Sequence, residues 1–209
     1  MNKKLIVTLV AAVIALLLGV MGYLIYSLNK SNEENKQMLE LAEMDKREME
    51  NEYENFALDF EYKLEPGANS GVLIYGSDTK NWIPNTVEVQ LLDDYAEKWS
   101  KDPAYMLNAS LYGHCAPTKQ TVRRAGEWNR MTVYARGKNI QIICNGEKVL
   151  DADLSRWTDA KKNPDGTNIP PWLSRPWAEL PTKGKIGFQG MHGKSKPYFR
   201  NIRIRSLAK

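Results

Sequence analysis

FALDFEYKL, residues 56–64, is the stretch that decides the fold. Its aromatic and leucine side chains occupy every second position, and Asp59, Glu61 and Lys63 lie between them. Because successive side chains of a strand point to opposite faces, this period of two predicts a β-strand with one buried face. The pattern begins at Phe56, so we expect a β-domain over residues 56–209.

Further short segments of the same kind follow, separated by turn residues. They read SGVLIYG (70–76), TVEVQLLD (86–93), NRMTVYARG (129–137), KNIQIIC (138–144), EKVLDADL (147–154), GKIGFQG (184–190) and YFRNIRIRSL (198–207). Asn145-Gly146 is typical of a type I′ turn, so it predicts a hairpin between two of them. Many short strands with almost no helical periodicity predict an all-β sandwich or jelly roll.

The N-terminal segment has a different character. Leu5 to Ser27 is a run of 23 residues without a charge, preceded by Lys3 and Lys4. As a helix it would span about 35 Å, enough for a hydrocarbon core of about 30 Å. Residues 1–30 therefore predict a single-pass signal anchor, with a cytoplasmic N-terminus and an exported main domain. The alternative is a cleaved signal peptide, which the length of the run and the lack of an Ala-x-Ala site disfavour.

Residues 31–55 form an acidic connector with nine acids, three bases and no Gly or Pro. Its abundant Glu, Lys, Met and Leu favour a helix. A thin apolar stripe that includes Met38, Leu41 and Met49 leaves two interpretations open. It either dimerises the chain as a short coiled coil or spaces the domain from the membrane, and fewer than four clean heptads favour the spacer.

Composition excludes some classes of function. Residues 56–209 hold 23 bases and 16 acids, but no Lys/Arg run is interleaved with aromatic residues, so we expect no nucleic-acid partner. Two histidines and scattered acids fit no ligand spacing, so we predict neither a metal nor another cofactor.

The stretch 155–182 interrupts the rhythm of strands. It contains Trp157, Trp172 and Trp177 and five prolines. A long irregular connection in a compact domain is often functional. The tryptophans either pack the loop onto the sandwich or present an aromatic face to a sugar, and both interpretations stay open.

Several segments, in order, carry a family resemblance. They are FALDFEYKLEPGANSGVLIYG, EVQLLDD, SLYGHCAP, GEWNRMTVYARG, CNGEKVLDADLSRW, GKIGFQGMHG and FRNIRI. Over residues 53–209 the chain resembles the 3-keto-disaccharide hydrolase domain family, whose members are concanavalin-like jelly rolls. That family usually opens with a Leu-Phe-Asn-Gly-like segment and several strands before the strand at Phe56. Here the anchor and connector stand in that place, so we expect an incomplete sandwich with unpaired strand edges.

The resemblance implies a reaction and candidate residues. A 3-keto group acidifies the C2 proton of a glycoside, so a base can remove it, the C1–O bond can break, and water can add back. Glu88 and Gln90 share one strand face, opposite Val87, Val89 and Leu91, and are candidates for acid/base and hydroxyl contacts. The other candidates are His192 and His114 for catalysis, and Tyr112, Gln189, Arg200, Trp157, Trp172 and Trp177 for substrate binding.

Three functional hypotheses follow. The first is a membrane-anchored enzyme that cleaves 3-keto-glycosides by elimination and hydration. The second is a non-catalytic carbohydrate-binding module on a membrane stalk, since similar folds host both. The third is a truncated and inactive domain.

Overall fold

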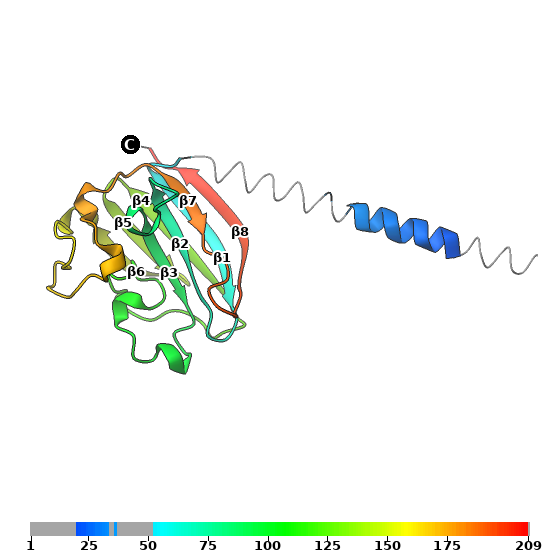
Figure 1. Ribbon diagram of the computed structural model, residues 1–209, viewed down its shortest axis with the longest axis horizontal. Helices are drawn as coiled ribbons and strands as arrows, with labels where there is room; N and C mark the ends of the chain where they lie inside the picture. The colour runs from blue at the N-terminus through cyan, green and yellow to red at the C-terminus, as the bar shows by residue number, and fades with distance from the viewer. Residues whose placement is uncertain (1–19, 34–35, 37–51, 209) are drawn as a thin grey trace, which may run out of the picture. The chain divides into compact units, whose positions relative to one another are not determined.

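The computed structural model describes residues 20–33, 36 and 52–208 of the 209-residue chain (Figure 1). The chain divides into two compact units, Met1–Glu48 and Met49–Lys209.

The described part of the first unit is helical over residues 20–33 and at residue 36. No helix within the described residues is both long and apolar enough to cross a membrane. Most of the predicted anchor at 5–27 and most of the acidic connector at 31–55 lie outside the described residues.

The second unit is built from two antiparallel sheets (Figure 1). The five-stranded sheet has the order β6-β5-β4-β1-β8, with bounds Glu147–Asp153, Asn139–Cys144, Trp128–Arg136, Phe56–Leu64 and Pro197–Ser206. The three-stranded sheet has the order β3-β2-β7, with bounds Val87–Leu92, Asn69–Gly76 and Lys185–Phe188. These strands coincide with the predicted segments, so the predicted all-β sandwich is confirmed.

Short 3-10 helices occupy the connections between strands. They are η1 (Ile83–Asn85), η2 (Glu97–Trp99), η3 (Ala104–Met106), η4 (Leu154–Arg156), η5 (Pro171–Leu173) and η6 (Trp177–Glu179). η5 and η6 lie in the irregular stretch 155–182 and η4 overlaps its start, so the stretch has local structure of its own.

The core lies between the two sheets, and alternate residues of β1, β4 and β5 fill much of it. On β1 the five aromatic and leucine side chains are at most 3% exposed, as the period of two predicts. On β3 Val87, Val89 and Leu91 are fully buried. Glu88 and Gln90 therefore point away from the core, as expected from their spacing.

β1 enters the five-stranded sheet between β4 and β8, so it has a hydrogen-bonded partner on each side. β1 therefore has no unpaired edge, and the edge strands of this sheet are β6 and β8. The β5–β6 hairpin turns at Asn145 and Gly146, whose φ angles of 51° and 87° are those of the predicted type I′ turn.

Residues 109–112 extend the three-stranded sheet along β3. Leu111 forms a β-bridge with Val89, and the Tyr112 amide donates to the carbonyl of Glu88 at 2.9 Å. Asn108, just before this segment, accepts from the buried hydroxyl of Tyr62 at 3.0 Å. The long connection after β3 is thus fixed to the core, and it brings Tyr112 beside Glu88.

Candidate active site

A pocket of about 160 Å³ opens on the outer face of the three-stranded sheet. β3 supplies Glu88 and Gln90, β2 supplies Asn69, and the other lining residues lie on connections between strands. The lining residues are Asn69, Trp82, Ile83, Glu88, Gln90, Tyr112, Trp172, Leu173, Gln189 and His192. Six of the ten predicted site residues therefore meet in one place.

Glu88 lies over a glycine of the neighbouring strand. A Cβ atom on Gly71 would lie 2.3 Å from Oε1 of Glu88, so the carboxyl group occupies the space that a side chain would fill. Burial raises the pKa of Glu88 to about 7, because its charged form loses solvating water. A carboxyl group with a pKa near 7 can both accept and return a proton at neutral pH.

Two glutamines offer hydrogen-bond acceptors to the pocket. Gln90 is 2% exposed, and its Nε2 donates to the Met106 carbonyl at 3.4 Å. The backbone N–H of Gln189 donates to the Gly71 carbonyl at 2.8 Å, so the backbone of Gln189 is joined to β2. The Oε1 atoms of both glutamines are buried without a hydrogen-bond partner among the described residues. Since unpaired buried acceptors are costly, a hydroxyl-rich ligand would satisfy them.

Tyr112 lies beside Glu88 and lines the same pocket. Burial, and in second place the charge of Glu88, raise the pKa of the Tyr112 hydroxyl above its ordinary value. The hydroxyl therefore stays protonated at neutral pH and can donate a hydrogen bond to a ligand.

The tryptophans of the long loop divide into two kinds. Trp157 and Trp177 are buried, and the Trp157 indole Nε1 donates to Asn163 at 2.8 Å. Trp172 is 55% exposed and lines the pocket together with Trp82. Packing therefore accounts for Trp157 and Trp177, whereas Trp172 has a ring free for an apolar sugar face.

The two histidines have different surroundings. His192 is exposed and lines the pocket on the connection between β7 and β8. His114 is buried and stacks on Trp177 with ring centroids 3.5 Å apart. Burial lowers the pKa of His114 to about 4, and its Nδ1 lies 2.9 Å from the Tyr112 carbonyl. His114 thus holds the backbone of Tyr112 and does not line the pocket.

Arg200 also lies away from the pocket. It stands on β8, on the outer face of the other sheet, where its Nε donates to Glu61 at 2.5 Å. Its guanidinium lies 3.9 Å from the centre of the Trp128 ring. In the part of the chain that the structure describes, no group of three or more His, Cys, Asp and Glu residues is placed to hold a metal ion.

Four lining residues were not among the predicted site residues: Asn69, Trp82, Ile83 and Leu173. Asn69 belongs to one of the motifs that carry the family resemblance, which was its only signal. Trp82 and Ile83 follow the polar loop SDTKN, and a tryptophan in so polar a stretch was the signal for them.

The fold is an antiparallel β-sandwich, and the site is a pocket on its outer face that holds a buried carboxyl group. Residues 45–205 match the family described as the 3-keto-alpha-glucoside-1,2-lyase-like domain, and the chain belongs to this family. Residues 3–70 also match a family described as a coiled-coil region of unknown function. That second description fits the coiled-coil alternative for residues 31–55.

Individual relatives agree with this assignment. A protein of Bacteroides thetaiotaomicron named 3-keto-disaccharide hydrolase is 29% identical over 177 residues, which cover 75% of this chain and 60% of that protein. A crystal structure of a "putative glycosyl hydrolase" from Parabacteroides distasonis is 52% identical, with a TM-score of 0.74, over 75% of this chain and 80% of that one. A second protein of that description from the same species, 24% identical over 76% of this chain and 75% of its own, has a TM-score of 0.62 and shares the fold.

The raised pKa of Glu88 predicts a stability effect that depends on pH. The folded pKa, about 7, exceeds the ordinary value of 4.5, so the folded chain binds this proton more tightly than the unfolded chain. Its contribution to the free energy of unfolding therefore falls as pH rises through this window. We expect Glu88→Gln to stabilise the protein at pH 8 by up to about 3 kcal/mol and to have little effect at pH 4.

Urea unfolding of the full chain at the two pH values measures this difference. Glu127→Gln, at an exposed position, is the matched control. An equal effect of Glu88→Gln at pH 4 and pH 8 would contradict the buried charge.

Proposed function

We propose that this protein cleaves 3-keto-glycosides by removing the C2 proton, eliminating the C1 substituent and adding water. The observation that carries the proposal is the buried Glu88 carboxyl group, with a pKa of about 7, in a pocket with aromatic walls. The family description and the name of the Bacteroides relative support the choice of substrate class.

The chemistry needs one base and one stabilised oxyanion. Ionised Glu88 takes the C2 proton, and the electron pair of that C–H bond moves toward the C3 carbonyl oxygen to form an enolate. The enolate then collapses, the C1–O bond breaks, and the leaving alkoxide takes a proton. Water adds to C1 of the resulting enone while a proton returns to C2, so the net reaction is hydrolysis. Glu88 can supply that last proton because its pKa is near neutrality.

Tyr112 and His192 are the proposed partners of Glu88. The Tyr112 hydroxyl, which stays protonated, donates to the developing enolate oxygen. His192, exposed at the mouth of the pocket, protonates the leaving oxygen or places its hydrogen bond there.

Substrate binding is assigned to the remaining walls. Trp172 and Trp82 offer aromatic faces to the C–H face of a sugar ring. The unpaired Oε1 atoms of Gln90 and Gln189 accept hydrogen bonds from sugar hydroxyls. The buried Gln90 is the more rigidly held of the two, since its amide nitrogen already donates to Met106.

We further propose that the chain is a membrane-anchored, exported enzyme. The uncharged run of 23 residues from Leu5 to Ser27 supports this location. The acidic connector at 31–55 would then hold the domain off the bilayer or pair two chains as a coiled coil.

Glu88→Gln is the direct test of the reaction. Because the amide cannot accept the C2 proton, we expect kcat to fall by about 1,000-fold while substrate binding changes only a few-fold. In the unmodified protein, kcat/KM should rise with pH to a plateau, with an apparent pKa of about 7. A proton NMR time course with a 3-keto-disaccharide measures turnover, and titration calorimetry with the variant measures binding. Binding without turnover in the unmodified protein would instead identify a carbohydrate-binding module.

Gly71→Ala tests the position of the carboxyl group. The new Cβ would meet Oε1 of Glu88 at 2.3 Å, and the flexible side chain of Glu88 would move aside. We expect kcat/KM to fall by about 100-fold, with the unfolding free energy changed by only about 1 kcal/mol. Gly187→Ala on β7 is the matched control, since its Cβ would meet Leu73 at an ordinary 3.8 Å. Equal activity of the two variants would show that Gly71 does not position Glu88.

Membrane attachment has a separate test. The full chain should sediment with membranes, resist carbonate extraction and dissolve in detergent, whereas a chain lacking residues 5–27 should stay in the supernatant. Protease added outside the cytoplasmic membrane should digest the β-domain of the full chain. Release of the full chain by carbonate would contradict the anchor.

A further inference from the structure

The outer face of the five-stranded sheet carries a second set of ordered side chains. The strands β4, β1 and β8 lie side by side there, and their register aligns outward-facing residues in rows. From one end to the other the rows are Tyr134–Ala57–Arg205, Thr132–Asp59–Arg203, Arg130–Glu61–Arg200 and Trp128–Lys63–Tyr198. The rows extend over about 20 Å of strand.

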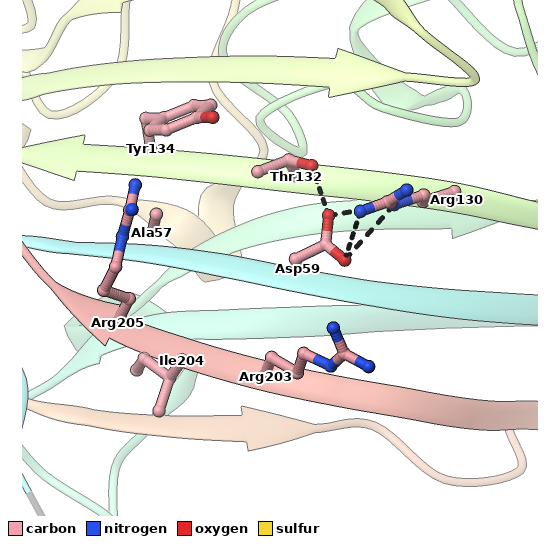
Figure 2. Close-up of a pocket in the computed structure, with 8 residues that line it drawn as sticks. All are labelled: Ala57, Asp59, Arg130, Thr132, Tyr134, Arg203, Ile204 and Arg205. Carbon is pink, nitrogen blue, oxygen red and sulfur yellow. Dashed lines mark hydrogen bonds and ion pairs between the residues drawn. The ribbon is translucent and has the colours of Figure 1, made fainter.

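Two hollows adjoin on this face. One, of about 290 Å³, is lined by Ala57, Asp59, Arg130, Thr132, Tyr134, Arg203, Ile204 and Arg205 (Figure 2). The other, of about 390 Å³, is lined by Glu61, Arg123, Trp128, Asn129, Arg130, Asn145, Gly146 and Arg200. They share Arg130, so together they form one continuous surface, which we call the arginine face.

The arginine face has an excess of positive charge. Five arginines line its hollows, against the two carboxylates of Asp59 and Glu61. Arg130 forms an ion pair with Asp59 at 3.1 Å, and Arg200 forms one with Glu61 at 2.5 Å. Among residues 52–208, no acid lies within 4 Å of the charged groups of the other three arginines, which are Arg123, Arg203 and Arg205.

The two carboxylates orient the arginines rather than filling the hollows. Asp59 accepts from the Thr132 hydroxyl at 2.7 Å as well as from Arg130. Figure 2 shows these bonds, and it shows Arg205 extending from β8 across Ala57 toward the Tyr134 ring. The small side chain of Ala57 leaves the space between Tyr134 and Arg205 open.

Aromatic rings alternate with the cations. Lys63 lies 5.1 Å from the centre of the Trp128 ring and 4.8 Å from that of Tyr198. Arg123 donates to the Trp128 carbonyl at 3.1 Å, which ties one of the unpaired arginines to this end of the face. Lys63, Trp128, Tyr198 and Arg123 come from separate segments of the chain, whereas Arg200, Arg203 and Arg205 lie close together on β8.

We propose that the arginine face binds an acidic polysaccharide, with its carboxylate or sulfate groups on Arg203, Arg205 and Arg123 and a sugar ring against Tyr134. Guanidinium groups bind such oxyanions through two parallel hydrogen bonds. A row of hollows about 20 Å long suits an extended chain with several charges rather than a single ion.

The position of the arginine face would allow the protein to bind a polymer while the proposed reaction takes place. The face and the pocket at Glu88 lie on opposite outer faces of the sandwich, because each points away from the same core. A polymer held on β8 therefore leaves the pocket open. Such a site would keep the enzyme on an acidic glycan matrix while it acts on small sugars.

The test compares two pairs of substitutions in the full chain. Arg203→Gln with Arg205→Gln removes two charges from the face, and Lys101→Gln with Lys161→Gln removes two charges from exposed positions elsewhere. Dextran sulfate and polygalacturonate are the charged probes, and unsubstituted dextran is the neutral one. We expect calorimetry to show binding of a charged probe that weakens with salt, and a loss of at least about tenfold for the arginine pair alone.

Turnover of a soluble 3-keto-disaccharide separates this site from the active site. Both double variants should keep it, since none of the four residues lines the pocket at Glu88. Equal loss of binding in both variants would mean a response to net charge alone and would overturn the proposal. Binding to phosphatidylglycerol vesicles but to neither charged polysaccharide would overturn it in favour of a lipid surface, and equal binding of neutral dextran would remove the role of the arginines.

Discussion

The alternation of side chains along strands that share one core is the constraint on which the rest of this structure depends. Once Val87, Val89 and Leu91 are buried, Glu88 and Gln90 must point outward into the pocket. The same rule applies to β1 on the other sheet, where buried aromatic residues force Asp59, Glu61 and Lys63 to the opposite outer face. A slip of one residue in either strand would exchange core and site. The register of each strand therefore determines both which residues pack in the core and which residues line the site.

Burial of a carboxyl group connects function with stability. Glu88 reaches its position because Gly71 has no side chain, and the loops that carry Trp82 and Trp172 enclose it. The pKa of about 7 makes Glu88 useful as a base, but the ionised form costs folding free energy above that pH. Such a cost is typical of residues that are retained for chemistry rather than for packing. Asp59 and Glu61, on the other sheet, form ion pairs with Arg130 and Arg200.

The strands could be predicted from the sequence because their signal is local. Alternation identified the strands at 56–64 and 86–93, short apolar segments between turn residues identified the others, and the Asn145-Gly146 turn identified a hairpin. Glu88 and Gln90 were predicted to share an outward face for the same reason. The positions of His114, Trp157 and Trp177 could not be predicted, because loop residues are buried or exposed according to tertiary contacts such as the stacking of His114 on Trp177. Arg200 was assigned to the substrate, but the sequence did not reveal that β8 pairs with β1 and thereby places it on the other sheet.

Charged groups are solvated differently on the outer faces of the two sheets, because loops cover the site on the three-stranded sheet. Loops enclose the three-stranded sheet, so a single carboxyl group there is desolvated and acquires an unusual proton affinity. Strand residues line most of the hollows on the five-stranded sheet, and Arg123 and the Asn145-Gly146 turn line part of one. The arginines there are exposed, so their charges stay hydrated and act on a ligand through number and alignment. An uncovered sheet face needs polar side chains, but acids and bases would serve that need equally well. The register of three strands instead aligns an excess of positive charge in rows. The need for solubility alone does not explain this excess.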